Sequence, residues 1–162
     1  MRKKSFPPVV AENTRLLVLG SLPGEASLAA QRYYAHPRNL FWTLMGEVVG
    51  EDLVGLDYED RLSTLLQHRV GLWDVVAEAS RIGSLDAAIT DPHENDLIAL
   101  VQTLPDLKAV AFNGAASAKA GARQLAPMAE RLALIRLPSS SPAYAGRMEL
   151  KREAWLALRS FL

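Results

Sequence analysis

The chain has 162 residues, of which 49% are hydrophobic and 22% are charged, and its 18 Lys and Arg balance 18 Asp and Glu for a formal net charge of +0. This length suits a single globular domain with one core, and the composition is neither disordered nor collagen-like. Since there is no cysteine, disulfides, zinc–thiolate sites and iron–sulfur clusters are excluded. The balanced charge argues mildly against a nucleic-acid-binding protein, because such domains usually carry excess positive charge.

The first 13 residues predict an N-terminal tail ahead of one domain over residues 14–162. Residues 1–4 are basic and are followed by Ser5, Phe6 and two prolines, with no apolar run of signal-peptide length. No stretch of about eighteen apolar residues is present, so no membrane span is expected. We therefore expect a cytoplasmic protein.

Short apolar runs alternate with helical patterns along the rest of the chain. Residues 15–20 form an apolar run that ends at Gly20 and predicts a strand buried on both faces. Further strands are predicted over residues 70–76, 107–112 and 131–137. Helices are predicted from Asn39 to Gly50, over 58–67, from a cap at Asn95 to Pro105, over 115–125 and over 147–161. Residues 81–94 predict a long loop.

Strands separated by helices predict parallel pairing through crossover helices. The expected fold class is α/β, a three-layer α/β/α sandwich with a short four-stranded parallel sheet. Ligands of such folds bind at the carboxyl ends of the strands. Three polar segments follow strand ends, at residues 20–24, 112–114 and 137–143. Their expected convergence is the main physical argument for a functional site.

Two of these segments are weak signals when taken singly. Residues 20–24 lack both the glycine spacing of a dinucleotide-binding loop and the Gly-Lys-Ser/Thr of a phosphate-binding loop, so a plain turn is the simpler interpretation. Residues 137–143 offer three hydroxyls and backbone N–H groups between prolines, which suit phosphate contacts. A polar loop fixed by proline explains them about equally well.

A fourth segment, residues 33–42, gathers two tyrosines, a histidine, an arginine and an asparagine ahead of a helix. Aromatic rings can stack on a planar base, and an amide can bind one or position a water. Asn39 would equally serve as a helix N-cap, and His36 as an ordinary loop histidine. We expect Phe41 and Trp42 to pack in the core.

The sequence gives little indication of metal binding or of a serine or lysine nucleophile. The histidines His36, His68 and His93 are isolated, so we expect no metal and no other cofactor. No serine stands in a nucleophile elbow, and no lysine lies in a candidate segment to form a Schiff base. Among the scattered carboxylates, only Asp74 is expected near a strand end.

Taken together, the four segments resemble the uracil-DNA glycosylase superfamily, most closely its hypoxanthine-DNA (deoxyinosine) glycosylase branch. The resemblance runs from about residue 15 to the C-terminus, and residues 35–42 are also similar to the mismatch-specific uracil glycosylases. Leu22 departs from those enzymes, which carry a water-positioning asparagine there, and Leu137 replaces the histidine or asparagine of many relatives. In the hypoxanthine branch, the resemblance places the catalytic amide at Asn39.

The resemblance implies a role in base excision repair, in which the enzyme flips the damaged nucleotide out of the duplex into a pocket. Asn39 would orient a water toward C1′, Tyr34 would stack on the base, and Asn113 would read its edge. Backbone donors near Ser21 and Leu22 would stabilise charge on the leaving base, and His36 joins the base-binding set. The residues expected to contact DNA are Pro23, Gly24, Ser139, Ser140, Ser141, Pro142 and Arg147.

Three functions remain open from the sequence. The leading one is a monofunctional glycosylase that excises hypoxanthine, and the others are a G/U mismatch or uracil glycosylase and a non-catalytic nucleic-acid-binding module. The expected partner is damaged DNA, bound by a monomer. Because the net charge is balanced, any basic surface must be local. Arg32, Arg38 and Arg147 lie in or beside the segments, whereas acidic residues cluster over 47–60, so we expect modest, salt-sensitive DNA affinity.

Overall fold

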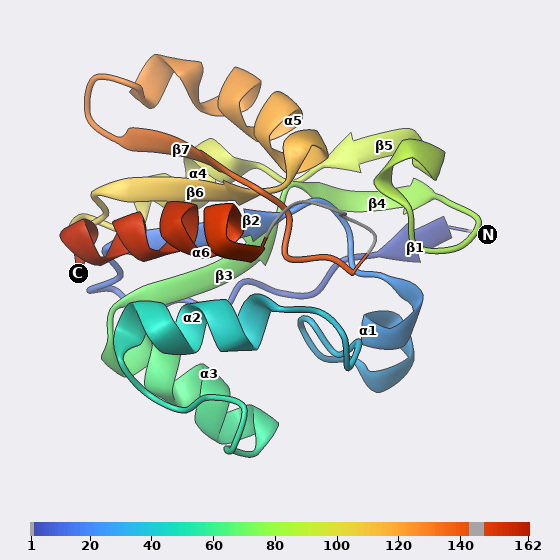
Figure 1. The fold of residues 1–162 in the computed structure, drawn as a ribbon. Coiled ribbons are helices and arrows are strands. Elements are labelled where there is room, and N and C mark those ends of the chain that lie inside the picture. The colour runs from blue at the N-terminus through green and yellow to red at the C-terminus, as the bar shows by residue number, and fades with distance from the viewer. Residues whose placement is uncertain (1, 143–147) are drawn as a thin grey trace.

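The computed structural model describes residues 2–142 and 148–162. Its central element is a four-stranded parallel sheet in the order β3-β2-β6-β7. The strands are β2 (Leu16–Gly20), β3 (Val70–Asp74), β6 (Ala109–Asn113) and β7 (Ala133–Leu137). Helices cover both faces (Figure 1). The predicted three-layer α/β/α sandwich is confirmed.

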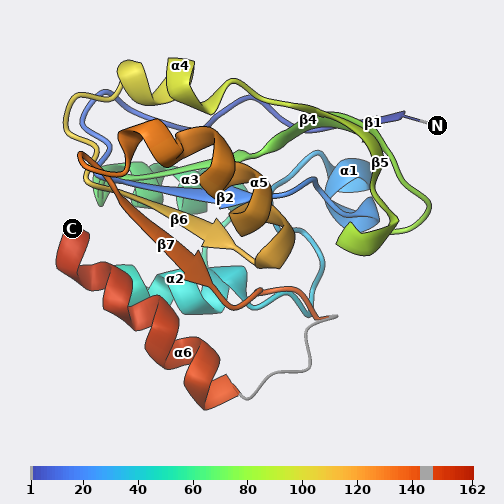
Figure 2. The same ribbon diagram turned by 90° about the horizontal axis from the view of Figure 1, so that it is seen from above.

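The two faces of the sheet carry two hydrophobic clusters. Leu16 and Val18 of β2 face a layer formed by α2 (Phe41–Val49), α3 (Tyr58–Gln67) and α6 (Met148–Leu156). Leu17 and Leu19 face the layer of α4 (Leu97–Gln102) and α5 (Ala115–Leu125). Figure 2 shows α2 and α6 on the side of the sheet opposite α4 and α5. Because β2 is buried on both faces, its sequence is a continuous apolar run.

A second, antiparallel sheet lies beyond the carboxyl ends of the large one (Figures 1 and 2). It has the order β1-β4-β5, formed by β1 (Arg2–Lys4), β4 (Val76–Ser80) and β5 (Thr90–Glu94). The predicted loop over 81–94 is therefore wrong in part, since it contains a 3-10 turn (Asp86–Ala88) and β5. Every residue of β5 is exposed and Pro92 lies within it, so this edge strand has no apolar alternation to reveal it.

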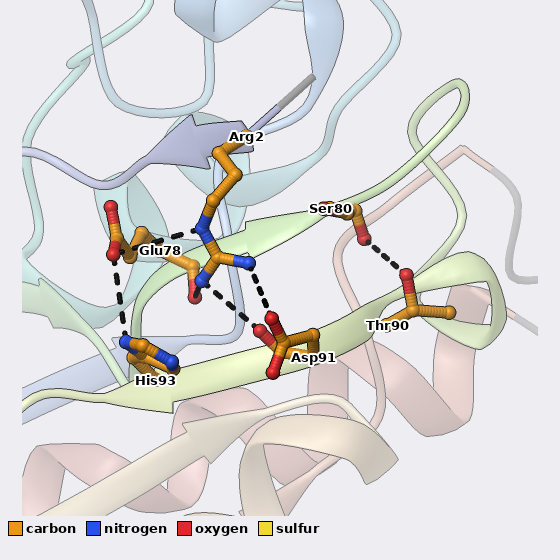
Figure 3. A network of polar contacts seen from close by, with 6 residues as sticks. All are labelled: Arg2, Glu78, Ser80, Thr90, Asp91 and His93. Carbon is orange, nitrogen blue, oxygen red and sulfur yellow. Dashed lines mark hydrogen bonds and ion pairs between the residues drawn. The ribbon is translucent and has the colours of Figure 1, made fainter.

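Polar side chains connect the strands of the small sheet (Figure 3). Arg2 Nη1 donates to Asp91 Oδ2 at 3.0 Å, so β1 is tied to β5 across β4. Glu78 Oε1 lies 3.7 Å from Arg2 Nε and 3.5 Å from His93 Nδ1. Residues 2–4, which were expected to be part of a tail, form β1 and pair with residues 78–80 of β4.

Several predicted boundaries also differ. The expected strand over 70–76 divides into β3 and β4, which run in different sheets. The cap of α4 is Asp96, whose Oδ1 accepts from Ala99 N–H at 3.0 Å, and not Asn95. The Asn95 side chain instead donates to Asp74 O at 2.8 Å.

The remaining helices are short. The helix α1 (Glu25–Ala30) was not predicted, because its six residues carry no clear period. The helix expected over 147–161 consists of α6 and a 3-10 turn (Ala157–Phe161), and a second 3-10 turn (Ala126–Met128) follows α5. Within the described ranges, no helix has the length and apolar character required to cross a membrane.

Candidate active site

A cavity of about 460 Å³ opens at the carboxyl ends of β2, β3 and β6. All the residues that the sequence placed in base or DNA binding border it, except Arg147, which lies outside the described residues. They are Ser21, Leu22, Pro23, Gly24, Tyr34, His36, Asn39, Asn113, Ser139, Ser140, Ser141 and Pro142. Parallel strands end at one edge of a sheet, and this edge brings the four sequence segments together.

Gly20 forms the part of the cavity wall where β2 ends. A Cβ atom there would lie 2.6 Å from Asp74 Oδ1 and 3.2 Å from Tyr34 Oη. Asp74 ends the neighbouring strand β3, and Asn113 ends β6 on the other side. The missing side chain of Gly20 therefore leaves room for Asp74 and Tyr34 to lean over the end of β2.

Asn113 is held by two hydrogen bonds to Ser140. Its Nδ2 donates to Ser140 Oγ at 2.8 Å, and its Oδ1 accepts from Ser140 N–H at 2.9 Å. Because both residues are buried, the amide is fixed in one orientation. An amide has two N–H donors and two acceptor lone pairs. One lone pair of Asn113 therefore remains for a ligand, and its second N–H lies within reach of the Tyr34 hydroxyl or of a ligand.

The loop that carries Ser140 is anchored on two sides. Leu40 N–H donates to Ser140 O at 3.0 Å, which joins it to the segment before α2. Trp155 Nε1 of α6 donates to Pro138 O at 2.9 Å. Ser140 is 0% exposed, so its hydroxyl supports Asn113 and faces no solvent.

Asn39 borders the cavity and also bonds to the start of α2. Its Oδ1 accepts from Phe41 N–H at 2.9 Å and so satisfies a donor in the first turn of α2, although Leu40 is the cap residue. The same side chain borders the cavity. One Oδ1 lone pair and the Nδ2 hydrogens are left for a water or a substrate.

Tyr34 stacks on the core through one face. Its ring lies 3.8 Å from that of Phe41 at an interplanar angle of 11°, and Phe41 and Trp42 are buried as predicted. Its hydroxyl is buried and makes no well-directed hydrogen bond among the described residues, although the Asn113 amide lies close enough to stabilise its ionised form. Burial raises the pKa of this hydroxyl, and the nearby Asp74 carboxyl adds to the shift.

Three carboxylates that border the cavity were absent from the predicted site: Glu25, Asp74 and Asp86. Asp74 had only been expected near a strand end. Burial raises the pKa of its carboxyl to about 7, the Asp86 carboxylate adds to the increase, and the Arg81 guanidinium opposes it. Asp86 Oδ1 accepts from Ser21 Oγ at 2.5 Å. A polar residue ending a buried strand could have indicated Asp74, whereas Asp86 comes from a stretch with no pattern.

The segment 20–24 is fixed by its main chain. The guanidinium of Arg81 is buried and donates to Leu22 O and Pro23 O. The Leu22 side chain packs with Val76 and Ala79. It therefore contributes apolar contact where the mismatch-specific enzymes would have an amide.

The described part of the chain contains no group of three or more His, Asp or Glu side chains able to hold a metal ion. His68 and His93 lie outside the cavity. His68 Nε2 is 3.3 Å from Glu51 Oε2, and His93 Nδ1 is 3.5 Å from Glu78 Oε1. His36 borders it, and its Nδ1 accepts from Arg38 N–H at 3.1 Å.

Known proteins are similar to this chain in sequence and in fold. The profile of the Uracil DNA glycosylase superfamily matches residues 7–159. Two relatives named Hypoxanthine DNA glycosylase, from Methanosarcina barkeri and Methanosarcina acetivorans, are each 46% identical over 114 residues, or 70% of this chain and 72% of theirs. A solution NMR structure from Methanosarcina acetivorans, provisionally named a uracil DNA glycosylase, gives a TM-score of 0.88 at 40% identity, over 98% of this chain and 97% of that one. The profile match spans all four segments that border the cavity, and the chain belongs to the uracil-DNA glycosylase superfamily.

Proposed function

We propose that this protein is a monofunctional DNA glycosylase that hydrolyses the N-glycosidic bond of deoxyinosine and releases hypoxanthine. The observation that carries the proposal is the meeting of the Asn39 and Asn113 amides at one cavity, in a chain 46% identical to two proteins named Hypoxanthine DNA glycosylase. Leu22 favours hypoxanthine over uracil as the released base. It stands where the mismatch-specific uracil glycosylases have the asparagine that positions the water, and a leucine cannot do so.

The reaction begins with flipping of the damaged nucleotide, which costs a few kcal/mol and less for a weakly paired base. Tyr34, backed by Phe41, offers an aromatic surface for the base. The second N–H and the remaining lone pair of the fixed Asn113 amide match an adjacent acceptor and donor such as O6 and N1–H of hypoxanthine. The segment 21–22 contributes backbone donors for the charge that develops on the base.

Asn39 positions the attacking water. Its Oδ1 is held by Phe41 N–H, so the amide has a fixed place from which to bind a water at C1′. The sugar passes through a transition state with oxocarbenium character, as in other glycoside hydrolyses. No covalent enzyme intermediate is formed.

The rim of the cavity contacts the DNA strand. Pro23 and Gly24 lie on one segment and Ser139, Ser141 and Pro142 on another. Ser140 holds Asn113 and acts as a positioning residue, and Arg147 stays a predicted phosphate contact. The enzyme acts as a monomer on damaged DNA, at the nucleoid in the cytoplasm.

A strand-cleavage assay tests the function. Labelled duplexes with hypoxanthine, uracil, xanthine or no lesion are incubated with the protein and then treated with alkali. We expect cleavage of the hypoxanthine strand. Cleavage of the uracil strand alone would show a uracil or G/U mismatch glycosylase, and binding without cleavage of any duplex would show a non-catalytic module.

A further inference from the structure

Asp74 is a buried acid that the proposed mechanism does not use. It is 4% exposed, it borders the cavity, and its Oδ2 has no hydrogen-bond partner among the described residues. Native proteins seldom leave a buried polar atom unpaired, because the loss of hydration is costly. Because Asp74 borders the cavity, a ligand bound there can supply the missing partner.

The geometry places this carboxyl where a base would lie. Its Oδ1 occupies the space over Gly20, 2.6 Å from the position of a Cβ atom there. The strand order puts β2 between β3 and β6, so Asp74 and Asn113 end strands that are two strand spacings, or about 10 Å, apart. A purine bound over Gly20 can therefore contact both side chains, because its N7 lies beside O6 and the two atoms can be approached from neighbouring strands.

The surroundings keep a large share of Asp74 protonated up to about pH 7. Burial and the Asp86 carboxylate raise the pKa of Asp74 to about 7, and Arg81 only partly offsets them. Tyr33 and Tyr34, whose hydroxyls the Asp74 charge also affects, stay neutral, because burial raises the pKa of both. The other titratable side chains that border the cavity are Glu25 and His36. Asp74 therefore retains a proton that it can donate.

We propose that Asp74 contacts the flipped purine and protonates N7 of the leaving base, an inference that rests on the proposed function. Asn113 is suited to the O6 and N1–H edge. Of the two remaining acceptors, N7 lies beside O6 whereas N3 lies on the far side of the ring, so N7 is the acceptor for Asp74. Uracil has no such atom. The Asp74 contact thus selects a purine leaving group over a pyrimidine.

The proton and electron balance is complete. The C1′–N9 bond breaks and its electron pair passes to the base, while the Asp74 proton moves to N7. The water held by Asn39 forms the C1′–O bond and releases one proton to solvent. The Asp74 carboxylate then takes a proton from solvent, so one water is consumed for each base released.

Single-turnover excision by wild type and Asp74→Asn tests the proposal. Asparagine keeps the size of the side chain and can donate a hydrogen bond, but it cannot transfer a proton. We expect hypoxanthine excision to fall by about 10²-fold or more, in the range of general acid catalysis. The wild-type rate should also fall tenfold per pH unit above about pH 7, a decline that Asp74→Asn should lack. Asp106→Asn, an exposed aspartate outside the cavity, is the matched control and should behave as wild type.

A modified substrate distinguishes protonation from positioning. With 7-deazahypoxanthine, which has carbon in place of N7, wild type and Asp74→Asn should excise at similar rates. An Asp74→Asn variant with the wild-type rate and pH profile on hypoxanthine overturns the proposal, and so does an equal loss on both substrates. If wild type releases no hypoxanthine, it is the proposed function that has failed.

Asp86→Asn gives a second test should Asp74→Asn not fold. Removing the Asp86 charge lowers the pKa of Asp74, so the alkaline decline in excision should move to lower pH. An unchanged decline would contradict the assignment of that decline to Asp74.

Discussion

The Asn39 side chain stabilises the start of α2 and borders the cavity at the same time. Asn39→Ala should lower the free energy of unfolding by about 1 kcal/mol, the usual value of a capping bond, and reduce excision by about 10²-fold or more. Asn39→Asp keeps an acceptor for Phe41 N–H and for a water. It should restore the stability and part of the activity, as measured by urea unfolding and single-turnover excision. Full activity in a destabilised Asn39→Ala would leave Asn39 only its capping role.

Tyr34 has a buried hydroxyl that makes no well-directed hydrogen bond among the described residues. Tyr34→Phe removes this unsatisfied group and keeps the ring stacked on Phe41. The free energy of unfolding should therefore rise by about 1 kcal/mol. Chemical denaturation checks the change, and a decrease would mean that the hydroxyl makes a stabilising contact in solution.

Among single residues, the sequence predicted those that stand in recognisable segments. Asn39, Asn113 and Tyr34 follow strand ends or precede a helix, and all border the cavity. Asp86 was not predicted, because it belongs to an exposed turn whose position depends on the small sheet. The bonds between Asn113 and Ser140 join residues that are 27 positions apart, and no local pattern encodes such a pair.

At the scale of elements, β1 braces one wall of the cavity. Lys3 Nζ donates to Glu25 Oε1 of α1 and, at 2.8 Å, to Gly83 O in the turn between β4 and β5. Its side chain is 11% exposed, whereas Lys4 in the same strand is exposed.

Lys3→Ala should therefore loosen both α1 and the turn that precedes Asp86. We expect faster hydrogen exchange at residues 82–86 and a severalfold higher KM for the hypoxanthine duplex, with little change in the midpoint of global unfolding. Lys4→Ala is the matched control and should resemble wild type. Identical behaviour of the two variants would deny this bracing role to Lys3.

Elements with a strong period were predicted closely. The bounds of α3 and α5 coincide with the predicted ranges 58–67 and 115–125. The missed elements α1, β1 and β5 have three to six residues and few buried apolar positions. Their stability comes from contacts with distant segments, such as the ties from Arg2 to Asp91 and Lys3 to Gly83, so the local sequence does not reveal them.

At the scale of the whole molecule, Asp74 makes stability depend on pH. Its folded pKa of about 7 lies above the ordinary value of 3.8, so the folded state binds the extra proton between these limits. The protonated Asp74 contributes its full share to the free energy of unfolding below about pH 4, and this contribution is lost as the pH rises to about 7. The free energy of unfolding of Asp74→Asn, minus that of wild type, should rise by on the order of a few kcal/mol from pH 4 to pH 8. Urea unfolding at several pH values measures this difference. A constant difference would indicate an ordinary pKa.

The net charge of +0 implies that DNA affinity depends on few local cations. The exposed Arg38 lies between His36 and Asn39, which both border the cavity. Arg38→Gln should reduce the slope of log affinity against log salt concentration by about 1. Arg131→Gln is the control, because Arg131 precedes β7 and so lies near the amino ends of the strands, away from the cavity. Titrations of a labelled duplex at several salt concentrations measure both slopes, and equal slopes for Arg38→Gln and wild type would remove Arg38 from the phosphate contacts.

The hydrogen bond from Trp155 to Pro138 O has a consequence for how the enzyme is made. Synthesis delivers the end of β2 early, but the loop that fixes Asn113 appears late, and its anchor on α6 later still. A nascent chain therefore holds most of the sheet before it has a base pocket. The loop that fixes Asn113 gains this anchor only once the last helix has docked, and a chain that stopped short of Trp155 would lack it.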